Sequence, residues 1–216
     1  MYYEIAKRTL DIASSLLLLI LFAPFMIATA IIILITSPGP ILVESSNMHM
    51  RRIGKGGKVF RLFKFRSMPV NADSLITRDP RYRHLYKEWK ESNFKLYNDP
   101  RVSKFGKFIR KYSIDETPQL FNVLKGDMSL VGPRPYHSDE LEEQQRRYPN
   151  TKRFVKETQT VKPGITGFWQ VSGRSNINFD RRIEMDAYYA RKKSILLDIL
   201  IILKTPLAML SGAGAV

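Results

Sequence analysis

The chain has 216 residues and carries 35 Lys and Arg against 20 Asp and Glu, which gives a formal net charge of +15. A 44% hydrophobic share excludes a wholly disordered basic tail, and the absence of cysteine excludes a disulfide scaffold, a Cys-ligated zinc site and thiol catalysis. This charge predicts an anionic partner: nucleic acid, a phospholipid surface or a phosphorylated small molecule.

The first predicted element is a membrane helix. No residue from Ile12 to Val43 is charged, and a helix over residues 12–35 would be about 36 Å long, more than the roughly 30 Å hydrocarbon core of a bilayer. Basic residues flank both ends, which favours the cytoplasmic side for both. Pro24 in the middle predicts a kink. A re-entrant helix broken at Pro24 satisfies both flanks, while an ordinary kinked span and a cleaved signal peptide remain alternatives.

A breaker cluster, Ser37 to Pro40, separates this membrane segment (residues 1–40) from a soluble domain (residues 41–216). Hydrophobic periodicity then predicts a strand over residues 59–65 and helical segments over residues 70–98, 102–111, 120–124, 139–148, 181–192 and 194–210. The last segment is strongly apolar and suits a membrane interface. We therefore expect a helix-rich α/β fold with interfacial amphipathic helices and a small sheet element.

The densest cluster of chemically special residues surrounds Asp115 and Glu116. Ser113 and Glu116 fit a capping box, and Thr117-Pro118 fits a helix start, so ordinary acidic residues in a first turn are one interpretation. The helix dipole and nearby basic residues would favour ionised carboxylates. The other interpretation is catalytic, because one ionised carboxylate can attack as a nucleophile while its neighbour holds a hard cation such as Mg²⁺.

Two further stretches have the composition of binding loops. In Gly132-Pro133-Arg134-Pro135, prolines fix the backbone on both sides of an arginine that suits bidentate phosphate recognition. In the run from Lys162 to Arg174, glycines set tight turns and aromatic residues follow, which suits a nucleotide. A plain tight loop and a turn that feeds a strand with a core Trp169 are the alternatives.

Taken together, these motifs resemble a known family. The order is Lys64-Phe65-Arg66-Ser67-Met68, Asp115-Glu116-Thr117-Pro118-Gln119-Leu120, Gly132-Pro133-Arg134-Pro135 and Pro163-Gly164-Ile165-Thr166-Gly167. This combination resembles the bacterial sugar transferase family, the monotopic phosphoglycosyl transferases, over almost the whole chain. The N-terminal Lys7-Arg8-x-x-Asp11, followed by an apolar segment with Pro24, also matches.

The resemblance implies an enzyme of the bacterial inner membrane whose catalytic domain lies on the cytoplasmic face. Such enzymes transfer a sugar 1-phosphate from a UDP-sugar to undecaprenyl phosphate, with Mg²⁺ as cofactor, and release UMP. They start the assembly of capsule, exopolysaccharide or O-antigen glycans. The partners implied are the UDP-sugar, undecaprenyl phosphate and membrane lipids, without nucleic acid. The resemblance leaves the oligomeric state open, a homodimer included.

The resemblance also assigns roles to residues. Asp115 would be the nucleophile that forms a phosphosugar-aspartyl intermediate, and Glu116 would help to bind Mg²⁺. Pro24 would break the re-entrant helix. The remaining matching positions would line the phosphate and nucleotide site, and they are Lys64, Arg110, Pro133, Arg134, Pro135, Arg174 and Asp198.

Some features depart from the family pattern or leave choices open. The segment from Glu44 to Met50 is atypical, with Arg52-Ile53-Gly54 later than expected, and Ala23 stands where a serine is common. The region from Asp79 to Pro100 and the Gly-rich C-terminus resemble members that act on galactose or glucose. Two alternatives remain: a membrane-tethered nucleic-acid-binding protein, and a non-catalytic anchor or scaffold of a glycan-assembly complex.

Overall fold

A computed structural model describes residues 2–43, 50–70, 72, 74, 79–91, 96, 99–173 and 177–210. Its α-helices are α1 (Tyr2–Thr36), α3 (Arg83–Glu91), α4 (Lys104–Lys111), α5 (Gln119–Lys125), α6 (Ser138–Arg147), α7 (Lys152–Thr158), α8 (Phe179–Lys192) and α9 (Ile195–Leu210). The strands are β1 (Arg51–Ile53), β2 (Val59–Arg61), β3 (Ser129–Val131) and β4 (Gly164–Thr166), and short 3₁₀ turns are η2 (Lys55–Gly57), η3 (Pro80–Tyr82), η4 (Ile114–Glu116) and η5 (Pro149–Thr151). The expected helix-rich fold with a small sheet element is confirmed.

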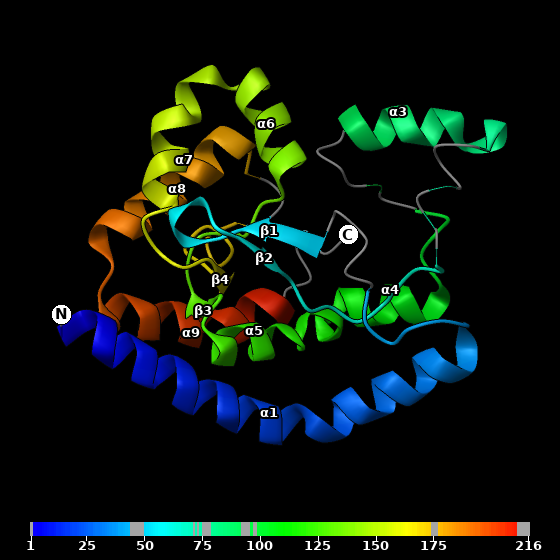
Figure 1. Cartoon of the computed structure of the whole chain (residues 1–216), viewed down its shortest axis with the longest axis horizontal. Helices are drawn as coiled ribbons and strands as arrows, with labels where there is room; N and C mark the ends of the chain where they lie inside the picture. Colours follow the sequence, from blue (N-terminus) through cyan, green and yellow to red (C-terminus); the bar gives the residue numbers. More distant parts are fainter. Residues whose placement is uncertain are drawn as a thin grey trace.

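Helix α1 forms one side of the molecule, and Figure 1 shows it as a long bent rod whose concave side faces α9, α5 and α4. It is continuous over 35 residues with Pro24 inside. The expected interruption therefore takes the form of a bend, and the apolar residues on either side of Pro24 stay helical. Of the described residues, this is the one helix long and apolar enough to cross a membrane.

The two faces of α1 are the reverse of those of a helix in a soluble protein. Its buried residues are Asp11, Ser15, Thr29 and Ile33. Large apolar side chains point outward instead, and Leu17, Ile20 and Phe25 are 67%, 75% and 62% exposed. Helix α9 also carries exposed apolar residues, such as Leu203 and Leu207. An exposed apolar surface of this extent is typical of a membrane contact.

Two small sheets organise the rest of the domain. Strands β1 and β2 form an antiparallel hairpin, and β3 pairs with β4 in parallel, with Ser129 opposite Gly164 and Val131 opposite Thr166. The main core lies around β3 and is formed by Leu62, Leu120, Val123, Met128, Leu130, Val131, Val161, Tyr189, Ala190 and Ile201. Helix α1 contacts α5, β3 and α9 around this core. The core thus joins the apolar helix to the strand that precedes the Gly132–Pro135 loop.

Most predicted elements are confirmed with shifted ends. The helix that was expected over residues 120–124 is α5, and Gly126 ends it in the left-handed region with φ of 92°. The strand expected over residues 59–65 ends at Arg61, although Phe65 still forms an isolated bridge with Leu42. Of the segment Glu44 to Met50, residues 44–49 lie outside the described residues, as do residues 211–216 of the Gly-rich C-terminus.

Candidate active site

Lys64, Asp115 and Glu116 form a compact charged cluster. The ammonium of Lys64 lies 2.9 Å from Oδ2 of Asp115 and 3.3 Å from Oε1 of Glu116. The Asp115 side chain is 2% exposed, whereas the side chains of Lys64 and Glu116 are 23% and 36% exposed. A ligand can therefore reach the cluster at Lys64 and Glu116, and Asp115 lies buried behind them.

Backbone and side-chain hydrogen bonds hold the Lys64 segment against the acidic pair. The N–H of Phe65 donates to the carbonyl of Asp115 at 2.9 Å. Asn122, which is fully buried in α5, accepts from the N–H of Phe63 at 2.9 Å and donates to the carbonyl of Arg61 at 2.7 Å. A single amide side chain thus fixes the extended segment just before Lys64, and the Phe65 N–H fixes it just after. This clamp explains why the strand-like pattern extends past the end of β2.

The turn that carries Asp115 differs from the predicted helix start. Ser113 adopts φ of 55°, the left-handed region, and makes no side-chain cap. The prediction of a capping box was therefore wrong. Asp115 and Glu116 lie in η4, one turn before α5, and not in the first turn of the helix. A non-glycine residue in this region is strained, and such strain persists where surrounding structure enforces it, often at functional sites.

Burial and neighbouring charges shift the pKa values of the Asp115 and Glu116 carboxyl groups in opposite directions. Burial raises the pKa of Asp115, and it outweighs the opposing ion pair with Lys64. Burial would also raise the pKa of Glu116, but Lys64, Arg134 and Arg52 outweigh it, so that pKa is lowered. The expectation that both carboxylates favour ionisation is thus wrong for Asp115. One turn of chain therefore carries a more basic carboxylate beside a less basic one.

Three arginines surround the cluster. Arg110 comes from α4, and its Nε donates to Oγ of Ser67 at 2.8 Å. It interacts electrostatically with both carboxylates of the acidic pair. Arg134 likewise interacts with Glu116, and its guanidinium lies 6.0 Å from the centre of the Tyr136 ring. The structure thus brings Lys64, Arg110 and Arg134 together around the acidic pair, as the sequence predicted.

Arg52 is a residue of this site that the motif reading missed. The N–H of Ile53, its neighbour in β1, donates to the carbonyl of Tyr136 at 2.9 Å, which places β1 beside the Arg134 loop. Burial and the like charge of Arg134 lower the pKa of Arg52 to about 10, while Glu140 and Glu116 oppose this shift. Two like-charged arginines beside a carboxylate suit an anionic ligand. The only sequence signal was the displaced Arg52-Ile53-Gly54.

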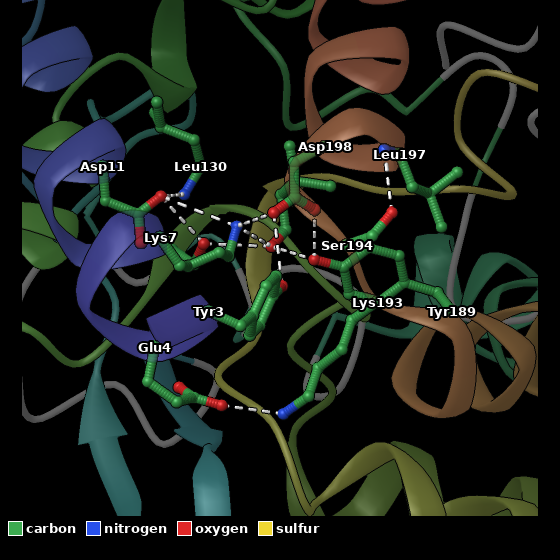
Figure 2. A network of polar contacts seen from close by, with 12 residues as sticks. Tyr3, Glu4, Lys7, Asp11, Leu130, Tyr189, Lys193, Ser194, Leu197 and Asp198 are labelled. Carbon is green, nitrogen blue, oxygen red and sulfur yellow. Dashed lines mark hydrogen bonds and ion pairs between the residues drawn. The ribbon is translucent and has the colours of Figure 1, made fainter. Parts of the chain in front are cut away.

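Asp198 lies in a second polar cluster, at the junction of α1, α8 and α9 (Figure 2). It is fully buried, and it pairs with Lys7 at 3.1 Å, accepts from Tyr189 at 2.6 Å and accepts from Tyr3 at 3.2 Å. Asp11 extends the cluster by accepting from the N–H of Leu130 and the hydroxyl of Ser129. Since protein donors fill both oxygens of Asp198, it holds helices together and does not join the Lys64 cluster.

Two arginines also attach both ends of α1 to this one domain. Arg8 donates to the carbonyls of Val123 and Leu124 at the end of α5, at 2.6 and 2.7 Å. Beyond the other end, Arg66 donates to Ser37, Pro38 and Pro40 at 2.6 to 3.0 Å. The sequence analysis treated Lys7 and Arg8 as membrane flanks and as part of a family motif, because spacing does not reveal such distant partners.

Of the remaining predicted site residues, the structure describes Pro133 and Pro135 but not Arg174. Pro133 and Pro135 flank Arg134, and the carbonyl of Pro133 accepts from the N–H of Gly164 at 2.9 Å. Arg174 lies outside the described residues.

Comparison with known proteins adds an independent result. The family model described as bacterial sugar transferase matches residues 2–212. The undecaprenyl-phosphate galactose phosphotransferase of Salmonella typhimurium is 45% identical over 213 residues, which are 97% of this chain and 41% of that protein. The UDP-glucose:undecaprenyl-phosphate glucose-1-phosphate transferase of Xanthomonas campestris pv. campestris is 36% identical over 219 residues, 99% of this chain and 40% of that protein.

A shorter relative matches over most of its own length. The exopolysaccharide production protein ExoY of Sinorhizobium fredii is 35% identical over 212 residues, 98% of this chain and 88% of that protein. The chain spans about two fifths of the length of the Salmonella and Xanthomonas relatives. A family match over nearly the whole chain agrees with the site geometry, and the chain therefore belongs to the bacterial sugar transferase family.

Proposed function

We propose that this protein is a phosphoglycosyl transferase that moves a sugar 1-phosphate from a UDP-sugar to undecaprenyl phosphate. The observation that carries the proposal is the buried carboxylate of Asp115, which is ion-paired with Lys64 at 2.9 Å and interacts electrostatically with Arg110, while Arg134 and Arg52 act on the adjacent Glu116. The named activities of the relatives support the same reaction class. The product would start a capsule, exopolysaccharide or O-antigen glycan.

The first step uses Asp115 as the nucleophile. A carboxylate oxygen attacks the phosphorus that bears the sugar, an acyl-phosphate bond forms, and the bond to the bridging oxygen breaks. That oxygen leaves with the electron pair as part of UMP. The raised pKa of Asp115 makes it a better nucleophile once ionised, and the ion pair with Lys64 supports the ionised form. Lys64 and the arginines offset the repulsion between the diphosphate and the attacking anion.

The second step regenerates the enzyme. A phosphate oxygen of undecaprenyl phosphate attacks the same phosphorus, the bond to Asp115 breaks, and the carboxylate is released unchanged. The product is a lipid diphosphate that carries the sugar. Because one covalent intermediate separates two displacements, ping-pong kinetics are expected.

Mg²⁺ fits this site through Glu116. In phosphoryl-transfer sites Mg²⁺ takes one or two carboxylates together with substrate phosphates and waters. Glu116 is partly exposed and keeps a lowered pKa, so it can serve as that carboxylate, beside Asp115. No cluster of three or more His, Cys, Asp and Glu occurs among the described residues, and such a site does not need one. When bound, Mg²⁺ would neutralise charge on the diphosphate.

The arrangement of α1 supports re-entry into one leaflet of the inner membrane from the cytoplasmic side. Arg8 near one end and Arg66 beyond the other both attach α1 to the same domain. A straight span would carry these two ends to opposite faces of a bilayer roughly 30 Å thick. The bend and the outward apolar face agree with a helix that enters and leaves on one side.

The donor sugar in this proposal is galactose or glucose. The sequence features of residues 79–100 favour these hexoses, and the names of two relatives contain them. A relative from Aeromonas hydrophila, 39% identical over 216 residues, is named for N-acetylgalactosamine instead. UDP-N-acetylgalactosamine therefore belongs in any test of the donor.

The decisive experiment measures UMP release by the purified protein in nanodiscs with Mg²⁺ and undecaprenyl phosphate. UDP-galactose, UDP-glucose and UDP-N-acetylgalactosamine are compared. We expect UMP from one of the two hexose donors, and sugar-labelled protein when the lipid is omitted. An absence of UMP with every donor would favour a non-catalytic anchor or scaffold. Release without labelled protein would reject the covalent intermediate alone.

Single-cysteine labelling tests the topology, because the chain has no native cysteine. Tyr2→Cys and Lys58→Cys place probes at exposed positions before and after the membrane segment, and Phe25→Cys is the control on its apolar face. With sealed inverted vesicles and a membrane-impermeant maleimide, we expect the first two to react and the third to be protected. Reaction of Tyr2 and Lys58 from opposite sides would establish a span.

A further inference from the structure

The loop from Gly132 to Pro135, which we call the Arg134 loop, is held by backbone hydrogen bonds at the end of the β3–β4 pair. The N–H of Gly132 donates to the carbonyl of Thr166, and the N–H of Gly164 donates to the carbonyl of Pro133, both at 2.9 Å. A Cβ on Gly132 would lie only 2.4 Å from the carbonyl oxygen of Lys162, so glycine is required for this approach. The Gly132–Pro135 loop and the start of the run from Lys162, which the sequence analysis treated separately, are therefore one structural unit.

Helix α8 holds the same loop through Asp186. This carboxyl group is fully buried, and its Oδ2 accepts from the backbone N–H of Arg134 at 3.1 Å. Its Oδ1 has no hydrogen bond of normal geometry among the described residues, although the Trp169 side chain interacts with the carboxyl group. A buried carboxyl group with an incompletely satisfied oxygen is unfavourable for stability alone. A role beyond packing would offset that cost.

Charged and polar groups from three segments surround Asp186. Arg134 and Tyr136 belong to the loop after β3, Trp169 follows β4, and Arg182 lies one turn earlier in α8. The Arg182 guanidinium also lies 4.8 Å from the centre of the Trp169 ring. Burial raises the pKa of Asp186 to about 8, against the opposing effects of the Arg134 N–H, of the Trp169 side chain and of both arginines. At neutral pH the group is therefore mostly protonated.

We propose that Asp186 is a positioning residue that holds the Arg134 loop so that the guanidinium faces the diphosphate of the donor nucleotide. This inference rests on the proposed function, since it assigns Arg134 to the donor. Asp186 touches no substrate in this scheme and acts through the backbone of Arg134. A neutral carboxyl group suits the role, because it accepts from the N–H without drawing the guanidinium away from the substrate.

The test compares two substitutions of similar size. Asp186→Asn keeps an oxygen that can accept from the Arg134 N–H, whereas Asp186→Leu removes the acceptor. The affinity for UDP is measured by calorimetry on the full chain in nanodiscs, and turnover by UMP release. We expect Asp186→Leu to weaken UDP binding about tenfold and Asp186→Asn to stay within about threefold of the wild type. Asp180→Asn, at an exposed position of the same helix, is the matched control.

A double-mutant cycle with Arg134→Ala separates positioning from general stability. If Asp186 acts through Arg134, Asp186→Leu should add no further loss of UDP affinity in the Arg134→Ala background. Additive losses would overturn the proposal. So would an Asp186→Leu protein that binds UDP as the wild type does. UDP binding also keeps the two hypotheses apart, because it can respond to Asp186 even if no donor sugar yields UMP.

A second measurement decides the matter if Asp186→Leu does not fold. As pH rises from 7 to 9, wild-type Asp186 ionises and competes with the diphosphate for Arg134, which has no counterpart in Asp186→Asn. We expect UDP affinity to fall more steeply in the wild type, by about threefold over this range. The same pH dependence in both proteins would reject the proposal.

Discussion

Two buried lysine–aspartate pairs in this protein have similar distances and different surroundings. Lys64 and Asp115 lie 2.9 Å apart, and Lys7 and Asp198 lie 3.1 Å apart. Asp198 also accepts from two tyrosines, so its carboxylate is fully satisfied (Figure 2). Lys64 is the ion-pair partner of the Asp115 carboxylate, and Arg110 adds an electrostatic interaction. The first pair is left free to react, and the second holds helices together.

The comparison shows that burial of a charged pair does not by itself mark a reactive site. Networks of buried charges are stable when each group is satisfied, and they then contribute to structural specificity. A pair that is partly open and has too few partners can exchange one of them for a substrate. Accessible Lys64 and Glu116 provide that opening, whereas the Asp198 cluster has none.

The largest expected effect is that of Asp115→Asn on turnover. The amide is a poor nucleophile, so UMP release should fall by at least about a thousandfold and no sugar-labelled protein should form. The unfolding free energy should change by only about 1 kcal/mol, because Lys64 keeps Glu116 as a partner. Asp139→Asn, at an exposed acidic position, is the control. Near-normal turnover of Asp115→Asn would move the nucleophile elsewhere.

In contrast to Asp115→Asn, Asp198→Asn should lower stability more than turnover. It removes the nearer of the two carboxylate partners of Lys7, which keeps Asp11 at 3.7 Å, and it weakens the bonds from both tyrosines. We therefore expect the unfolding free energy in detergent to fall by about 2 kcal/mol, with turnover per folded molecule little changed. The exposed pair Lys193–Glu4 provides a matched control, and Glu4→Gln should remove about 0.5 kcal/mol or less. A stable Asp198→Asn protein that loses UDP binding would return Asp198 to the nucleotide site.

Arg52→Gln tests whether the missed arginine belongs to the reactive region. Its charge faces Glu116 and Arg134, so we expect UDP affinity to fall about tenfold while the unfolding free energy changes little. Arg51→Gln changes the neighbouring, exposed side chain and should leave affinity within about twofold. Equal effects of the two changes would show only a general contribution of positive charge.

Much of the helical organisation could be predicted from the sequence because it depends on local patterns. The stop of α5 at Gly126 follows from one residue in the left-handed region, and the membrane segment follows from its lack of charge. The cluster around Asp115 could be predicted only through ordered motifs far apart in the chain. No local pattern brings Lys64 to Asp115; the Asn122 clamp does.

The differences from the sequence-based expectations depend on long-range partners. Asp198 was assigned to the substrate by its match to a family position, and that role stays a prediction, while the structure surrounds its carboxylate with Tyr3, Lys7 and Tyr189. A turn with Ser113 in the left-handed region stands where the sequence predicted a capping box, and Ser113 makes no side-chain cap there. The direction of the Asp115 pKa was also missed, since burial cannot be read from an acidic dipeptide.

The smallest expected effect is a shift of the acid side of the pH profile. Turnover needs ionised Asp115, so kcat/KM should fall as pH drops through a pKa that burial places above the ordinary range for aspartate. The like charge of Glu116 adds to that rise, after the opposing Lys64. In Glu116→Gln the pKa of Asp115 should therefore fall, and the residual activity should persist to lower pH than in the wild type.

The control for that shift is Asp139→Asn, which should leave the acid side of the profile in place. An unchanged profile in Glu116→Gln would mean that a group other than Asp115 controls the acid side. The two lysine pairs would then still differ in their partners, but the effect of Glu116 on the pKa of Asp115 would no longer explain the reactivity of the Lys64 pair. A shift to lower pH would tie the coupling to turnover, because Glu116 acts on Asp115 and has no contact with the Asp198 cluster in the described structure.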